Sequence, residues 1–175
     1  MLSFSRSSNL KKTTEFNNQQ IHLFQQFFVH PDEKRQEEIK FCLKKNVENS
    51  LIDKIYLLNE RIYKEGELGS SSNKIIQKKI KTRLSYKKLF NYIHKKNITG
   101  YIVFSNSDIF LDDTIDNIRR TDFHKNKNFI GLLRYDYDVK SKKSNIFGPR
   151  FDSQDTWIIH TDHLPNKDIL DIFDF

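Results

Sequence analysis

The segment TGYIVFSNSDIFLDD, residues 99–113, carries the clearest information about the fold. Its residues YIVF form a short, unbroken apolar run, which is typical of a strand that is covered on both faces of a parallel sheet. The run stops abruptly at Asn106, Ser107 and Asp108. Ligands of open parallel sheets bind beyond the carboxyl ends of the strands, so this strand end is the first candidate for a functional site.

The sequence on either side of this segment alternates between strand and helix patterns. We expect strands at residues 21–29, 52–60, 74–81, 101–104, 128–138 and 155–160. We expect helices at residues 33–46, 85–97 and 114–120, a helical turn at 168–175, and loops at 63–73 and 140–154. Asp32 and Ser85 are typical N-cap residues for the first two helices. This order predicts an α/β fold with a mostly parallel central sheet and helices on both faces.

The composition indicates one globular domain preceded by a polar segment. Residues 1–18 show no apolar pattern, so we expect a flexible tail followed by a single domain at residues 19–175. The one cysteine, Cys42, excludes an internal disulfide and a four-cysteine zinc site. No apolar run approaches the roughly 18 residues of a membrane span, and no secretory signal is present. We therefore expect a cytoplasmic protein without membrane contact, or one in a host cytoplasm if the Lys-, Ile- and Asn-rich composition has a viral origin.

The charge is unevenly distributed along the chain. The net charge is +7, but residues 1–100 hold 20 Lys and Arg against 10 Asp and Glu, whereas residues 101–175 hold 10 against 13. The basic part is the natural place for an anionic partner, and nucleic acid is one such partner. The acidic part is the natural place for a metal or proton-transfer site, because Mg²⁺ and Mn²⁺ prefer oxygen ligands. No P-loop or dinucleotide-binding glycine motif is present, so those classes are unsupported.

Several motifs at matching spacings resemble one enzyme family. The strand end NSDIFLDD is similar to the metal-binding "DxD" region of GT-A fold glycosyltransferases, and the later motifs LLRYD and SQDTW strengthen the likeness to a group of small glycosyltransferase-like proteins. The segments KRQEEIKFCLKKNVEN, IDKIYLLNE and RLSYKKLF also fit, so the resemblance covers roughly residues 20–163. It implies a GT-A-like domain that transfers a sugar from a UDP- or GDP-linked donor to a hydroxyl acceptor with the help of Mn²⁺ or Mg²⁺.

The resemblance also implies roles for the polar residues at the strand ends. Asp108 would be a metal ligand, whereas Asn106 stands where the family has its first acid and is expected to contact the sugar or ribose. Arg83 and Arg134 would bind the donor's phosphates, because a guanidinium suits phosphate geometry. The alternatives are that Asp108 caps a turn and that both arginines are surface charges. Asp155 is the candidate for the base that takes the proton from the acceptor hydroxyl. An alternative for Asp155 is a hydrogen bond to the backbone at the start of a strand.

Four further residues carry weaker expectations. Phe28 closes the first strand, where this fold seats the nucleotide base, and Glu60 closes the second, where it could bond the base or ribose. Trp157 is the candidate for the acceptor pocket, and His160 for an additional metal ligand. The alternatives are that Phe28 and Trp157 belong to the core, that Glu60 caps a loop, and that His160 is a surface residue.

Other functions remain open at this point. Lysines interleaved with aromatic residues at 74–88 favour a nucleic-acid-binding protein, and DNA could even be the glycosyl acceptor, although no known recognition motif is present. Asp108 with Asp112 or Asp113 could imitate a two-metal nuclease, but these acids are also typical of a helix N-terminus. A degenerate relative could bind a nucleotide sugar without turnover. Since little chain follows the last strand, we expect a homo-oligomer, a partner protein or a small exposed acceptor.

Overall fold

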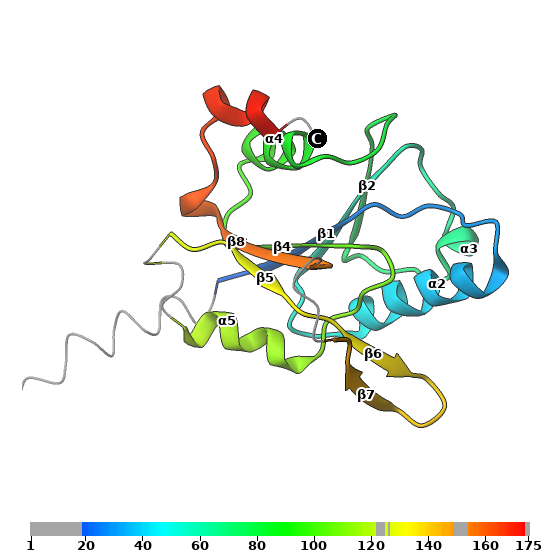
Figure 1. Ribbon diagram of the computed structural model, residues 1–175. Helices are drawn as coiled ribbons and strands as arrows, with labels where there is room; N and C mark the ends of the chain where they lie inside the picture. The colour runs from blue at the N-terminus through cyan, green and yellow to red at the C-terminus, as the bar shows by residue number, and fades with distance from the viewer. Residues whose placement is uncertain (1–18, 122–124, 126, 149–153, 174–175) are drawn as a thin grey trace, which may run out of the picture.

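The computed structural model describes residues 19–121, 125, 127–148 and 154–173 (Figure 1). The flexible tail expected at residues 1–18 lies outside the described residues, and so does Asp152 in the expected loop at 140–154. In the described part of the chain, no helix is long and apolar enough to span a membrane.

A six-stranded mixed sheet forms the centre of the molecule. Its spatial order is β3 (Ile75–Lys79), β2 (Lys54–Asn59), β1 (Ile21–Gln25), β4 (Tyr101–Ser105), β8 (Thr156–His160) and β5 (Ile130–Leu132). The first four of these strands are mutually parallel, whereas β8 runs antiparallel to both β4 and β5. The predicted α/β architecture with a mostly parallel sheet is confirmed.

Helices pack on both faces of this sheet (Figure 1). One face carries α2 (Glu33–Glu48) and α5 (Asn117–Arg120), which continues the 3-10 turn η1 (Asp113–Asp116). The other face carries α4 (Tyr86–Lys96) and η4 (Lys167–Phe173). Short turns complete the order: α3 (Glu65–Leu68) and η3 (Thr161–His163). Both predicted caps are confirmed, since Asp32 accepts the Arg35 N–H at 3.1 Å and Ser85 accepts that of Lys88 at 3.4 Å.

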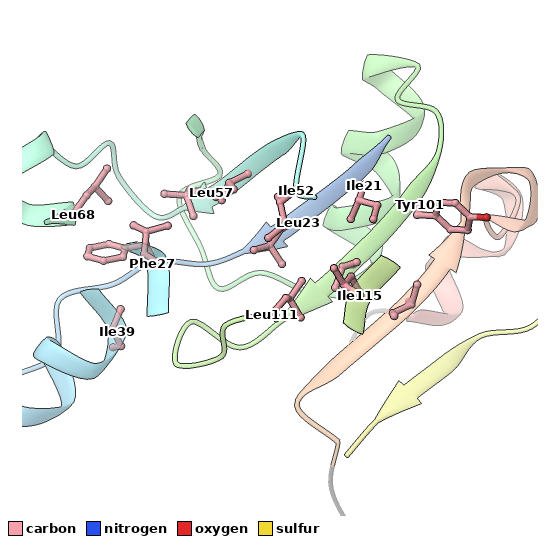
Figure 2. Packing of buried hydrophobic residues seen from close by; sticks show 14 of the residues in the cluster. Ile21, Leu23, Phe27, Ile39, Ile52, Leu57, Leu68, Tyr101, Leu111 and Ile115 are labelled. Atoms are coloured by element: carbon pink, nitrogen blue, oxygen red, sulfur yellow. The ribbon is translucent and has the colours of Figure 1, made fainter. Parts of the chain in front are cut away.

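Alternating side chains of the strands divide the core into two clusters. Ile21 and Leu23 of β1 point to the α2 side, where they pack with Ile39 and Ile115 (Figure 2). Phe24 points to the α4 side and stacks on Tyr56, with ring centroids 4.6 Å apart. Because both faces of the central strands are covered, each of these strands directs apolar side chains to both faces, as the run YIVF indicates.

Four predicted elements differ from the structure. The strand expected at residues 21–29 ends at Gln25, so Phe28 follows β1 by three positions and does not close it. The strand expected at residues 128–138 is two strands in different sheets, because the chain leaves the main sheet after β5 and forms a hairpin from β6 (Tyr135–Asp138) and β7 (Lys143–Ile146). The loop expected at 140–154 therefore contains β7, and the loop expected at 63–73 contains α3. The hairpin is held on α2 by aromatic packing, in which Phe41 stacks on Tyr137 at 6.0 Å.

Candidate functional site

The sheet order places a topological switch point between β1 and β4. The chain continues from β1 to β2 on one side of β1, whereas β4 lies on its other side, so the connections leaving these two strands diverge at their carboxyl ends. Open α/β sheets bind their ligands at such a switch point. The antiparallel strand β8 begins at the same edge, because Thr156 is paired with Ser105. Polar residues that end β4 and precede β8 therefore meet here.

Buried amide side chains hold the loop that follows β4. The Gln25 Nε2 donates to the carbonyl oxygens of Asn106 at 2.7 Å and Ile109 at 3.1 Å. The fully buried Asn46 of α2 donates to the Ile109 carbonyl at 2.9 Å and accepts the Leu111 N–H at 2.9 Å. An unmade hydrogen bond on such a buried amide would cost about 1–3 kcal/mol, so these bonds fix one conformation of the loop. The loop's outward side chains are thereby presented by a rigid support.

Asp155 is held by two partners at this edge. One carboxylate oxygen, Oδ1, accepts the Asn106 Nδ2 at 2.9 Å, and the other, Oδ2, accepts the Arg134 Nη1 at 3.0 Å. The Asn106 N–H also donates to the Asp155 carbonyl at 3.1 Å. The Asp155 side chain is 15% exposed. Each carboxylate oxygen has two lone pairs, so each keeps one acceptor site after these bonds are made.

The guanidinium of Arg134 is fixed by more than Asp155. Its Cζ lies 3.8 Å from the centroid of the Phe147 ring, a cation–π contact, and its Nε lies 3.8 Å from the Asp136 carboxylate. Arg134 follows β5, which runs in the same direction as β4, so both strands deliver their following residues to the same edge. The structure thus brings together three of the sequence-predicted residues: Asn106, Arg134 and Asp155.

Asp108 forms an ion pair that the sequence analysis missed. Its Oδ2 accepts the Arg35 Nη2 at 2.8 Å, and the other terminal nitrogen of Arg35 contacts Glu38. The hydrogen bond from Asp108 is the main reason that the pKa of Arg35 is raised above its usual value. Arg35 lies in the first turn of α2, directly after the Asp32 cap. The sequence did contain a signal for this pair. A helix that follows a parallel strand begins at the carboxyl end of that strand, so the first turn of α2 is expected at the same edge of the sheet as Asp108.

The residues at this edge offer a divalent cation too few ligands to hold it without a bound ligand. Among the described residues, no group of three or more His, Cys, Asp or Glu side chains is placed to hold a metal. Asp108 is one carboxylate with one oxygen already paired to Arg35. Mg²⁺ is commonly bound by one or two carboxylates together with substrate phosphates, so the donor set suits an ion that is shared with a ligand.

The structure does not bring His160 to Asp108. In the antiparallel pairing His160 lies opposite Tyr101, at the far end of β4 from Asn106 and Asp108. The His160 ring is buried and contacts Gln19 and the Asp162 carboxylate instead. Four residues of strand separate the two ends by about 13 Å, so His160 and Asp108 cannot ligate one ion. The prediction treated the end of the last strand as part of the site, whereas β8 contributes its beginning.

Two of the remaining predicted residues, Phe28 and Arg83, lie in the segments that follow β1 and precede α4. Phe28 is 44% exposed and therefore not a core residue. Arg83 is exposed in the loop before α4, and that loop is tied to β1 because Gln26 donates to the Thr82 carbonyl at 3.1 Å and accepts the Leu84 N–H at 2.9 Å. An exposed aromatic ring and an exposed arginine thus follow β1 and precede α4, on the β1 side of the switch point.

The last two predicted residues are Glu60, which follows β2, and Trp157, which lies in β8. Glu60 is exposed and directly follows the buried Asn59, whose Oδ1 accepts the Phe27 N–H at 2.8 Å. Trp157 is half-buried on the α4 side of the sheet, stacked on Phe104 at 5.6 Å and edge-on to Tyr86 at 5.9 Å. Packing against core aromatics accounts for the position of Trp157 without a ligand.

Comparison with known proteins adds no assignment to this geometry. No protein-family model matches the chain, and no curated protein matches it.

Proposed function

We propose that this protein is a metal-assisted glycosyltransferase with a GT-A-like fold that transfers a sugar from a nucleotide-diphosphate sugar to a hydroxyl acceptor. The observation that carries the proposal is the meeting of Asn106, Arg134 and Asp155 beside Asp108, at the switch point of an α/β sheet. The motif resemblance in the sequence points to the same residues. Cations for a phosphate leaving group and a carboxylate for a hydroxyl proton are what such a transfer needs.

The donor is proposed to lie across the carboxyl ends of β1 and β4. Phe28 offers an exposed ring to the nucleotide base, and Glu60 and Asn106 offer hydrogen-bonding groups to the base, ribose or sugar. Arg83 and Arg134 supply charge for the diphosphate. Asp108 would hold a Mn²⁺ or Mg²⁺ ion jointly with the donor's phosphates, and the ion would stabilise negative charge on the leaving diphosphate.

Asp155 is proposed as the general base. The Asn106 amide and the Arg134 guanidinium fix the orientation of its carboxylate, and each oxygen keeps a lone pair for an incoming hydroxyl. As the acceptor oxygen bonds to the anomeric carbon, its proton passes to Asp155 and the bond from that carbon to the diphosphate oxygen breaks. Trp157 lies on the α4 face of the sheet, so it would contact an acceptor that extends over this face.

Calorimetric titration tests the donor site directly. UDP and GDP are titrated into the full chain with and without Mn²⁺, and into the variants Asp108→Ala and Asp113→Ala. We expect one nucleotide to bind more tightly with Mn²⁺, and this gain to disappear in Asp108→Ala only. Asp113→Ala is the matched control, because Asp113 is an exposed carboxylate of the same strand–helix connection. Absence of binding by both nucleotides under all conditions would refute the donor site.

A second measurement separates an enzyme from a degenerate binder. Release of the nucleoside diphosphate from candidate donors is followed for the wild type, Asp155→Asn and Asp136→Asn. We expect Asp155→Asn to lower turnover by at least about 100-fold, the range of general-base catalysis, with little change in nucleotide affinity. Asp136→Asn should retain most of the turnover, because Asp136 lies 3.8 Å from the Arg134 Nε, beyond hydrogen-bond distance, and Asp155 still holds Arg134 at 3.0 Å. Nucleotide binding without turnover of any donor by the wild type would favour the degenerate reading.

A further inference from the structure

A long stretch of this chain contains cations without any acid. Between Leu68 and Ser107 the sequence has nine Lys and Arg residues and no Asp or Glu. The net charge of this stretch, +9, exceeds the +7 of the whole chain. It includes β3, which is the edge strand of the sheet, and α4. Such a segregation of charge predicts a strong local positive potential if the side chains are not neutralised in the fold.

Five of the nine cations have hydrogen bonds, an ion pair or a helix-terminal position that explains them within the fold. Lys74 donates to two carbonyls at the end of α2, at 3.1 and 2.8 Å, and Lys87 pairs with Asp171 at 2.9 Å. Lys88 donates to the Arg83 carbonyl at 3.0 Å. Lys95 and Lys96 lie in the last turn of α4, where cations stabilise the helix dipole. These residues have a structural role that needs no ligand.

The other four cations are exposed and close together in the sequence, and the two in β3 project to opposite faces of this edge strand. They lie at the end of β3 and in the loop before α4, and we call them the β3 basic surface: Lys78, Lys79, Lys81 and Arg83. Among the described residues, none of their side chains has an acidic partner within ion-pair distance. Glu60 is the nearest acid along the neighbouring strand, since Asn59 pairs with Lys79, whereas Glu67 is neutralised by Arg61 at 2.6 Å. A net positive charge remains.

The loop that carries Lys81 and Arg83 is bonded to the residues that end β2 and follow β1. The Ile80 N–H donates to the Asn59 carbonyl at 2.7 Å, and the Gln26 side chain bridges the backbone of Thr82 and Leu84. Lys81 has φ +65°, a left-handed conformation that side-chain-bearing residues rarely adopt. The exposed ring of Phe28 follows Gln26 by two positions. Cations on both faces of an edge strand and along the following loop suit an extended single-stranded nucleic acid, in which phosphates repeat, and the exposed Phe28 ring is of the kind on which a base stacks.

We propose that the β3 basic surface binds the phosphate backbone of a single-stranded nucleic acid. The inference does not depend on the glycosyl transfer proposed above, but both proposals use Arg83 and Phe28, so a nucleotide donor and the nucleic acid would compete at these two residues. A small anion would need several donors that converge on one point, whereas these four side chains are spread along a strand end and a loop. Each cation that meets a phosphate releases about 0.7 counterion from a single strand, so four contacts give a slope of about −2.8 in a plot of log K against log salt concentration.

Fluorescence anisotropy with a labelled oligothymidylate tests the proposal. For the full chain, we expect affinity to fall about 50-fold between about 50 and 200 mM salt, from the slope of four contacts. Removal of two contacts in Lys79→Ala/Arg83→Ala should reduce the slope to about −1.4, hence a fall of about 7-fold. The matched control is Lys95→Ala/Lys96→Ala, which removes the same charge at the other end of α4 and should keep the wild-type slope.

Three results would overturn the proposal. The first is no binding of the oligonucleotide at about 50 mM salt, where electrostatic contacts are strongest. The second is an equal loss in both double variants, which would show a diffuse effect of net charge. The third is binding to vesicles of anionic lipid that Lys79→Ala/Arg83→Ala abolishes, with no such loss for the oligonucleotide. Thermal melting of each variant confirms that all of them are folded, as expected for exposed side chains.

Discussion

Replacement of Arg35 by Gln should strengthen the binding of a divalent cation at Asp108. Arg35 is bonded to Asp108 at 2.8 Å and also contacts Glu38, so the cation is placed between two carboxylates. With Arg35 present, the three side chains carry a net charge of −1. Without it, the same place carries −2 and the Asp108 oxygen is no longer occupied. The resident guanidinium and an added Mn²⁺ or Mg²⁺ thus compete for one carboxylate.

The size of this effect follows from the charges. A Mn²⁺ ion bound to Asp108 would lie about 5 Å from the guanidinium, and at the dielectric constant of water their repulsion is about 1.7 kcal/mol. The Arg35–Asp108 pair is partly exposed, with side chains 50% and 28% accessible, so its own contribution is small, about 0.5 kcal/mol. Salt screening reduces the sum. We therefore expect Arg35→Gln to bind Mn²⁺ about tenfold more tightly than the wild type.

Titration of Mn²⁺ followed by electron paramagnetic resonance measures this directly, without a nucleotide. Lys34→Gln is the matched control, because Lys34 is an exposed cation one position away on α2 and should leave Mn²⁺ affinity almost unchanged. Asp108→Asn in the Arg35→Gln background should remove the gain. If Lys34→Gln and Arg35→Gln changed the affinity equally, or if neither did, competition at Asp108 would be refuted.

Two further predictions concern stability. Gly100→Ala should lower the free energy of unfolding by at least about 2 kcal/mol, because the added Cβ would lie 2.5 Å from the Gln20 carbonyl oxygen and Gly100 has φ +115°. Gly66→Ala in α3 meets no atom within 4 Å and should be neutral or slightly stabilising, and urea denaturation compares the two. Burial lowers the pKa of His22, whose Nε2 lies 3.1 Å from the Thr99 carbonyl, while its buried Nδ1 has no hydrogen-bond partner among the residues that the structure describes. The unfolded state therefore binds the proton first, so stability should fall as the pH drops below about 6.5, and His22→Gln should flatten this dependence in thermal melts at graded pH.

Local chemistry explains which parts of the fold were predictable. The cap at Asp32 and the cap at Ser85 depend on a hydrogen bond to a backbone group three residues later, so the sequence alone contains both partners. The apolar run in β4 likewise reports its own burial. By contrast, a continuous strand pattern at residues 128–138 contains no information about the sheet to which each half belongs. After the break between β5 and β6, Tyr137 packs against Phe41 of α2, a residue 96 positions away that no local pattern identifies.

The sequence indicated the polar residues of the candidate site, but not the hydrogen bonds and ion pairs between them. Asn106, Asp108, Arg134 and Asp155 were each marked by their positions at the ends of apolar runs. Their partners lie far along the chain: 73 positions separate Arg35 from Asp108, and 49 separate Asn106 from Asp155. No local pattern reports such pairs. The direction of β8 was equally hidden, and this is why His160 was placed at the wrong end of the sheet.

The direction of β8 has the largest consequence for the site. If β8 were parallel to β4, its carboxyl end and His160 would lie at the same edge of the sheet as Asn106, and Asp155 would lie at the opposite edge. Because β8 is antiparallel to both neighbours, β5 recovers the direction of β4, and Leu132 lies opposite Thr156 just as Ser105 does. The residues after β4, after β5 and before β8 must then meet at one edge. One reversed strand is therefore sufficient to collect an amide, a guanidinium and a carboxylate from three separate segments without an additional domain.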